Sequence, residues 1–256
     1  MKGGAFMPRT ARKKSKTGVY HVTLRGINRQ EIFIDNEDAE RFMQAVKDSQ
    51  AISQFTLYAY CLMGNHVHLV LKEGNEPIEQ IIKRIGVRFV YWYNWKYKRS
   101  GHLFQDRYGS EPVEDDAYLI AVVRYVHRNP VKAGICKRCE EYPYSSIQEY
   151  LDRRKMPYVQ TEDVKAMMEG EDLETFFNTP TEFECLEITE TGRKTDEEAR
   201  EIMKGICKCN QPNAFQKLPF EKQVSAIERM REKLSIRQIA RITGVSTEIV
   251  RKYKAR

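Results

Sequence analysis

Apolar residues in the first half of the chain follow two different periods, which separate strand segments from helix segments. Alternating or short apolar runs predict strands over residues 19–26, 55–62, 66–71 and 107–113. Apolar residues at helical spacing predict helices over residues 36–49, 77–97 and 116–129. The predicted order is therefore strand, helix, strand, strand, helix, strand, helix.

Local signals place the ends of these elements. Asp35 and Asn36 form a cap signal before the first helix, and Gly64 with Asn65 forms a turn between two strands that pair as a hairpin. An acidic stretch opens the last helix, and Pro130 is expected to stop it. The order matches the ferredoxin-like plait, an α+β fold in which helices lie on one side of an antiparallel sheet.

The chain changes character after residue 150. Residues 1–150 form one expected domain, and the acidic, mixed residues 151–216 are expected to be a linker or a small helical region. Within them, Thr195 and Glu198 form a capping box that opens a helix ending near Cys207.

Residues 217–256 have the pattern of an all-α helix-turn-helix module. A helix is predicted over residues 221–233. After it, Ala240 provides the small helix contact of such a module, Gly244 provides the turn glycine and Val250 provides the apolar anchor. A recognition helix starting near residue 246 exposes three candidate DNA contacts, namely Thr247, Arg251 and Lys252. The alternative is a trihelical bundle that docks another protein.

Basic residues are concentrated at the start of the chain. Lysine and arginine outnumber aspartate and glutamate by 43 to 36, and residues 1–30 contain no acidic side chain. Such an arm is typical of phosphate-binding surfaces, so DNA contacts are expected from Arg12, Lys13, Lys14, Arg25 and Arg29. The alternative is a solvated, disordered tail.

Two further features of the sequence indicate where the protein works. No apolar run is long enough to cross a bilayer and no secretory signal begins the chain, so a cytoplasmic, nucleoid-associated location is expected. The six cysteines favour reduced thiols over a disulfide framework. A zinc site from Cys136, Cys139, Cys207 and Cys209 is disfavoured, because the second pair is closely spaced and far from the first.

His66 and His68 flank Val67 in a predicted strand. Side chains alternate across a strand, so both imidazoles point to one face while Val67 packs on the other. Two imidazoles on one face can bind a divalent cation, although they make an incomplete ligand set. The alternative is a pair of half-exposed histidines on an amphipathic strand.

Tyr125 and Asn129 are four residues apart in the last predicted helix, so they share one helical face. A tyrosine nucleophile beside an amide oxygen would complement a two-histidine metal site. The alternative is an ordinary amphipathic helix residue, with its ring packed and its hydroxyl hydrated.

Residues 88–99 interleave aromatic and basic side chains within the second predicted helix. Such a surface can stack unpaired bases and bind phosphates. The preferred interpretation is that most of these rings are core or domain contacts, since several share helical faces.

Three stretches together resemble the REP-associated tyrosine transposases, relatives of the small single-tyrosine insertion-sequence transposases and of the HUH class of single-strand DNA nucleases. They are residues 20–29 (YHVTLRGINR), 63–68 (MGNHVH) and 124–134 (RYVHRNPVKAG). The resemblance covers roughly residues 15–150. It does not extend to the acidic middle or to the helix-turn-helix.

The resemblance implies specific roles. His66, His68 and Asn129 would bind Mg²⁺ or Mn²⁺, and Tyr125 would attack a scissile phosphate to leave a 5′-phosphotyrosine and a free 3′-hydroxyl. Gln105 and Arg107 are further candidates for positioning DNA. The expected partners are single-stranded or hairpin DNA, with duplex through the C-terminal module and no membrane.

Other functions stay open at this stage. They are a non-catalytic DNA-binding regulator and an HUH initiator nuclease of replication or conjugation. The sequence also leaves open a homodimer.

Overall fold

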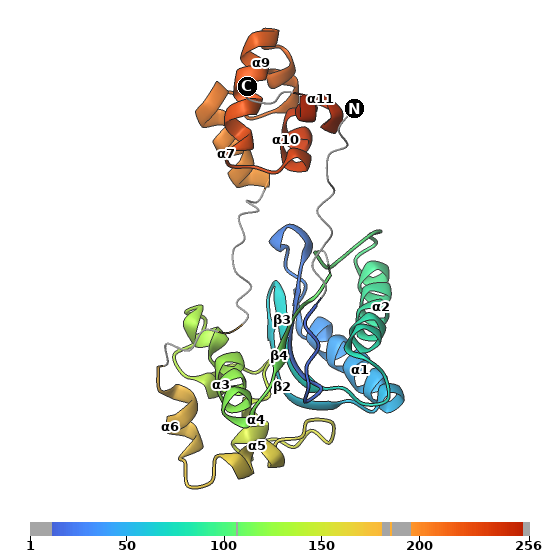
Figure 1. Cartoon of the computed structure of the whole chain (residues 1–256), viewed down its shortest axis with the longest axis vertical. Helices are drawn as coiled ribbons and strands as arrows, with labels where there is room; N and C mark the ends of the chain where they lie inside the picture. Colours follow the sequence, from blue (N-terminus) through green and yellow to red (C-terminus); the bar gives the residue numbers. More distant parts are fainter. Residues whose placement is uncertain (1–11, 106, 181–184, 186–195, 253–256) are drawn as a thin grey trace. The chain divides into compact units, whose positions relative to one another are not determined.

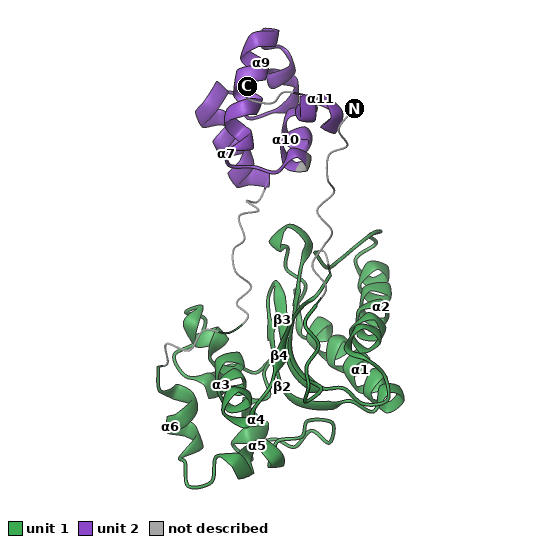
Figure 2. Cartoon of the chain, viewed as in Figure 1, with its two compact units in different colours: residues 1–187 green, residues 188–256 purple. Residues whose placement is uncertain are grey.

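The computed structural model describes residues 12–105, 107–180, 185 and 196–252. The chain divides into two compact units, residues 1–187 and residues 188–256, which Figure 2 colours separately. Each unit is described by itself below. Among the described helices, none has both the length and the apolar composition needed to cross a membrane.

The first unit is built on a four-stranded antiparallel sheet. Its strands are β1 (Val19–Arg25), β2 (Thr56–Met63), β3 (His66–Lys72) and β4 (Gly109–Val113), in the spatial order β2-β3-β1-β4. Helix α1 (Asn36–Ser53) joins β1 to β2, and α2 (Ile78–Lys96) joins β3 to β4. This βαββαβ order confirms the predicted ferredoxin-like plait.

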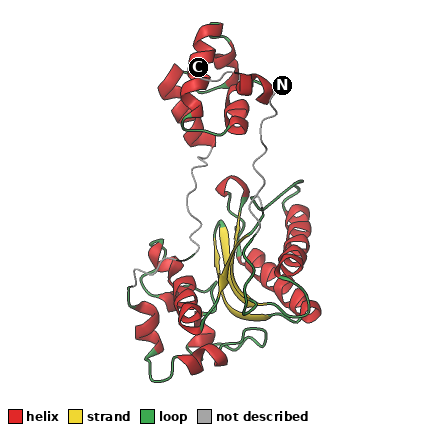
Figure 3. Ribbon diagram, viewed as in Figure 1, coloured by secondary structure: helices red, strands yellow, loops and turns green. Residues whose placement is uncertain are grey.

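Helices cover both faces of this sheet (Figures 1 and 3). One face packs on α1 and α2, through residues that include Val22, Val67 and Leu69. The opposite face packs on α3 (Asp116–Lys132), through residues that include Val70 and Val122. The plait itself has α1 and α2 on one side, as expected, and α3 covers the other side because both faces of the central strands are apolar and each needs a cover.

Helix α3 begins as predicted but ends later. The Asp115 side chain accepts a hydrogen bond from the Tyr118 backbone amide and caps the helix. Pro130 does not stop the helix, which runs on to Lys132. Pro130 has no N–H for the Val126 carbonyl, and the Asn129 side-chain nitrogen lies 3.4 Å from that carbonyl oxygen as a substitute donor.

Three short helices complete the first unit, namely α4 (Ile147–Tyr150), α5 (Glu162–Met167) and α6 (Leu173–Asn178). Val164 and Phe177 from the last two are buried in the same core as α3. Residues 151–216 are expected from the sequence to be a linker or a small helical region, and their first part, through Asn178, forms helices that pack on the rest of the first unit. Two 3₁₀ turns, Ile27–Arg29 and Cys139–Glu141, lie in connecting loops.

The second unit contains five helices among its described residues. They are α7 (Asp196–Cys207), α8 (Pro212–Gln216), α9 (Phe220–Arg231), α10 (Ile236–Thr243) and α11 (Thr247–Lys252). Ala199 and Met203 of α7 share one core with Ile227 and Met230 of α9. The unit thus begins before residue 217, while the predicted cap Thr195 and the basic residues before Arg12 lie outside the described residues.

Gly244 lies in the turn between α10 and α11. Gly244 ends α10 in the left-handed region with φ 70°, where a β-carbon would also come within 2.4 Å of the Gln216 side chain. Val250 is buried in the core of the unit. The glycine therefore permits both the turn and the close packing against α8.

Candidate active site

Strand β3 carries His66 and His68 on the sheet face that α3 covers. In the β1–β3 pairing, Arg25 lies opposite His66 and Thr23 opposite His68. His66 is half-buried, whereas His68 is 1% exposed. The alternative of two half-exposed histidines therefore does not fit His68, because α3 and the neighbouring strands exclude water from that imidazole.

Each histidine uses its Nδ1 atom within the protein. His68 Nδ1 lies 2.9 Å from His21 Nε2, and His66 Nδ1 lies 2.6 Å from Asn65 Oδ1. An amide oxygen only accepts, so His66 donates from Nδ1 and keeps the lone pair on Nε2. Nε2 is thus the atom of His66 that is left to bind a cation.

Burial keeps both imidazoles neutral. Burial, with the positive charge of Arg25, lowers the pKa of His66 to about 4. Burial also lowers the pKa of His68 well below its ordinary value, and the neighbouring His21 and His66 lower it further. Neutral imidazole is the form that binds metal, so the site is ready for a cation near neutral pH.

Tyr125 projects from α3 toward these histidines. Its ring centroid lies 5.9 Å from that of His68 and 6.0 Å from that of His21, and both ring pairs meet edge to face. The Lys132 ammonium lies 5.7 Å from the centre of the Tyr125 ring. The structure thus brings the predicted tyrosine and the predicted histidine strand together across the layer boundary.

Asn129 lies one helical turn after Tyr125. Its side-chain nitrogen donates to the Tyr125 carbonyl at 2.9 Å, as well as approaching the Val126 carbonyl. These bonds hold the amide nitrogen against the helix and leave Oδ1 as the atom that can act as a ligand. Asn129 therefore offers an oxygen ligand from the face of α3 that bears Tyr125.

The sequence interpretation missed His21, which contacts His68, and two side chains that lie beside His21. His21, Glu111 and Cys185 bring one potential ligand atom each within 4.8 Å of one another. His21 is fully buried on β1, and Glu111 lies directly opposite it on β4. A histidine within an apolar strand was the available signal, but its partners come from pairing between strands that are distant in sequence.

Some of the predicted DNA-contacting residues of the first unit lie near the histidines, and others lie elsewhere on its surface. Arg25 and Gln105 adjoin the histidines, because the Gln105 amide donates to the Arg25 carbonyl at 2.7 Å beside the end of β1. Arg29 lies nearby, since its carbonyl accepts from the Asn65 side chain. Arg12 stacks on the Tyr108 ring at 3.7 Å.

The remaining candidates lie on the surface. Lys13, Lys14 and Arg107 are exposed in the first unit, and Arg251 and Lys252 are exposed on α11 of the second, where Thr247 is half-buried. On α2, Phe89 and Tyr93 are buried, as expected of core contacts. Tyr91 and Trp95 are 80% and 75% exposed. These two rings are not core contacts, because they lie on the side of α2 that faces away from the sheet.

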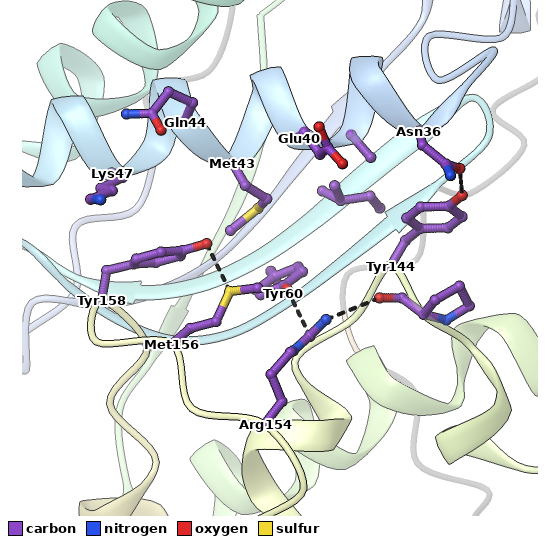
Figure 4. Close-up of a pocket in the computed structure, with 13 residues that line it drawn as sticks. Asn36, Glu40, Met43, Gln44, Lys47, Tyr60, Tyr144, Arg154, Met156 and Tyr158 are labelled. Carbon is purple, nitrogen blue, oxygen red and sulfur yellow. Dashed lines mark hydrogen bonds between the residues drawn. The ribbon is translucent and has the colours of Figure 1, made fainter.

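A pocket of about 570 Å³ lies on the other face of the sheet, between α1 and the loop that follows Pro143 (Figure 4). Figure 4 shows the rings of Tyr60, Tyr144 and Tyr158 around it. Arg154 borders the pocket but is paired with Glu149 at 2.8 Å, so its charge is already neutralised. The pocket lies on the α1 side of the sheet and does not include Tyr125 in its lining.

The first unit is a ferredoxin-like plait that brings two strand histidines close to a helix tyrosine, and its sequence is similar to known transposases. Residues 14–129 match the family model described as Transposase IS200 like. The first unit, which contains these residues, is therefore similar to that family.

Two individual proteins are also similar to this chain. A Haemophilus influenzae protein named as a REP-associated tyrosine transposase is 26% identical over 145 residues, which are 52% of this chain and 81% of the relative. A solved REP-associated tyrosine transposase bound to a REP hairpin is 20% identical, with a TM-score of 0.51, and the match covers 62% of this chain and 93% of that protein. The second comparison supports the fold.

Proposed function

We propose that this protein cleaves and rejoins single-stranded or hairpin-flanked DNA through a covalent tyrosyl intermediate. The observation that carries the proposal is the contact between the Tyr125 and His68 rings, 5.9 Å between centroids, on the covered face of the sheet. The contact supports the proposal because, if Tyr125 is the nucleophile and His68 a metal ligand, attack on a phosphodiester requires the two to lie close together. The family of the domain and the hairpin bound by its solved relative support DNA as the substrate.

The donor set of the site fits a divalent cation. His66 and His68 would bind it through Nε2, and Asn129 would bind it through Oδ1. When bound, Mg²⁺ or Mn²⁺ would neutralise the scissile phosphate and stabilise the charge that develops during attack. Imidazoles favour transition metals over Mg²⁺, so Mn²⁺ is the better probe.

Tyr125 supplies the nucleophile. Its Oη attacks the phosphorus, the phenolic proton is lost, and the departing 3′-oxygen gains a proton as it leaves. The resulting 5′-phosphotyrosine conserves the energy of the phosphodiester bond. A second 3′-hydroxyl can therefore attack the ester, release Tyr125 and join the strands without ATP.

Basic side chains around the site would hold the phosphate backbone. Arg25 and Arg29 lie beside the histidines, and Lys132 places a positive charge near the Tyr125 ring. Binding through such contacts falls steeply as salt rises, because counterions are released from the nucleic acid. The second unit would add duplex contacts through Thr247, Arg251 and Lys252 of a helix-turn-helix.

The test is incubation of the purified protein with end-labelled, hairpin-flanked single strands and Mn²⁺. A covalent protein–DNA adduct together with rejoined strands is the expected result, and both should disappear in Tyr125→Phe. Nicked strands with an adduct but no joining would instead indicate an initiator nuclease. Binding with no adduct under any metal would indicate a regulator and would contradict the proposal.

A further inference from the structure

Three side chains from neighbouring strands form a line on the α3 face of the sheet. Glu111 on β4 lies opposite His21 on β1, with Glu111 Oε2 4.0 Å from His21 Nδ1. His21 Nε2 in turn lies 2.9 Å from His68 Nδ1 on β3. The two ring planes are 18° apart, and the ring centroids are 5.2 Å apart.

The negative charge of Glu111, at one end of this line, influences which ring nitrogens of His21 and His68 carry protons. A carboxylate cannot donate, and the negative charge of Glu111 4.0 Å away favours a neutral His21 that carries its proton on Nδ1. Nε2 of His21 is then a bare acceptor, and His68 must donate to it from Nδ1. The lone pair of His68 is consequently on Nε2, the atom left for a cation.

We propose that Glu111 and His21 are positioning residues that fix the orientation and tautomer of His68 as a metal ligand. The inference rests on the proposed function, in which His68 binds the cation. Ligating histidines in metal sites commonly donate their second ring N–H to a fixed acceptor, which orients the ring and raises its basicity. Here the acceptor is a second histidine, fully buried and itself adjacent to a carboxylate.

Two other groups contact this line. Cys185 Sγ lies 3.7 Å from His21 Nδ1, and the Tyr118 hydroxyl hydrogen-bonds to Glu111. His21, Glu111 and Cys185 could instead bind a metal ion of their own. His21 Nδ1 would then be a ligand atom and would carry no proton. His21 would then donate from Nε2, and His68 would carry its proton on Nε2, where it blocks the cation. The two arrangements predict opposite tautomers for His68.

The first test reads the tautomer directly in the full, metal-free protein. The chain has five histidines, so ¹⁵N-histidine labelling gives a spectrum that single substitutions can assign. Long-range ¹H–¹⁵N correlations should show His68 protonated on Nδ1. A His68 protonated on Nε2 would overturn the proposal, and this measurement needs no variant of His21.

The second test measures Mn²⁺ affinity without DNA. His21→Leu removes the acceptor and should weaken binding about 10-fold to 100-fold, whereas His21→Gln, whose Oε1 can accept from His68, should retain most of the affinity. Cys185→Ala should leave the affinity unchanged. So should His127→Gln, which replaces another fully buried histidine that bonds to Ser146.

The outcomes separate the inference from the proposed function. Unchanged affinity in His21→Leu, with binding lost in His68→Ala, would overturn the positioning role and leave the metal site intact. Equal Mn²⁺ binding by the wild type and His68→Ala would overturn the metal site and the positioning role together.

Discussion

The ring of Tyr125 on α3 meets the ring of His68 on β3 edge to face, with 5.9 Å between their centroids. This contact exists because α3 packs on the sheet face opposite to α1 and α2. It places a phenol and a neutral imidazole side by side in a largely buried setting. The predictions below follow from this arrangement.

Tyr125→Phe should abolish the covalent DNA adduct, lowering its rate of formation by at least about a thousandfold. The ring and its packing remain, so stability and DNA binding should persist. Adduct formation is measured on denaturing gels with labelled DNA. Tyr118→Phe is the matched control on the same helix, and it should keep forming the adduct. An adduct that survives in Tyr125→Phe and vanishes in Tyr118→Phe would reassign the nucleophile.

Substitutions of the two strand histidines should differ in their effects on stability. His68→Ala leaves a buried gap and removes a partner of His21, so it should lower the free energy of unfolding by about 2–3 kcal/mol. The half-buried His66→Ala should cost about 1 kcal/mol or less. Both should lose Mn²⁺ binding and cleavage. Denaturant unfolding checks the first pair of values, and equal destabilisation by the two variants would contradict the burial of His68.

Removing residues 188–256 should leave a folded first unit that still cleaves a short single strand. Residues 1–187 contain both cores of the plait, whereas a deletion from residue 217 would divide the core shared by α7 and α9. Affinity for longer DNA that carries duplex should fall, because the second unit is proposed to bind it. Cleavage and affinity are compared at matched salt. If the folded truncation fails to cleave the short strand, the second unit belongs to the active site.

Acid should destabilise the first unit through His127. Burial lowers the pKa of this histidine to about 3, so it is neutral when folded and binds a proton more readily when unfolded. Its contribution to stability is complete above its unfolded pKa of about 6.5 and is lost as pH falls toward 3, at up to about 1.4 kcal/mol per pH unit.

The measurement is the free energy of unfolding from pH 7 to pH 4 in the wild type and in His127→Gln. The variant should show a shallower decline, although Ser146 loses its imidazole partner. His102→Gln, at an exposed position, is the control and should follow the wild type. Identical slopes in all three proteins would show that His127 does not contribute.

Periodicity predicted the order of strands and helices, which matches a plait, because alternation and helical spacing are local properties of the chain. It also placed His66 and His68 on one face of one strand and put Tyr125 and Asn129 on one face of one helix. The strand and helix bounds agree with the structure to within a few residues. The prediction that Pro130 ends the helix was wrong. The Asn129 side chain approaches the Val126 carbonyl, which proline leaves without its usual donor.

Only the tertiary structure decided what surrounds His68. Strand order brings β4, β1 and β3 together, so Glu111 approaches His21 and His21 reaches His68 although the three are far apart in sequence. The packing of α3 then buries His68 and brings Tyr125 to it. The sequence determines which residues share a face of their own element, because that follows from backbone geometry. Which faces meet depends on burying apolar surface across the whole fold, and that is settled between elements rather than within them.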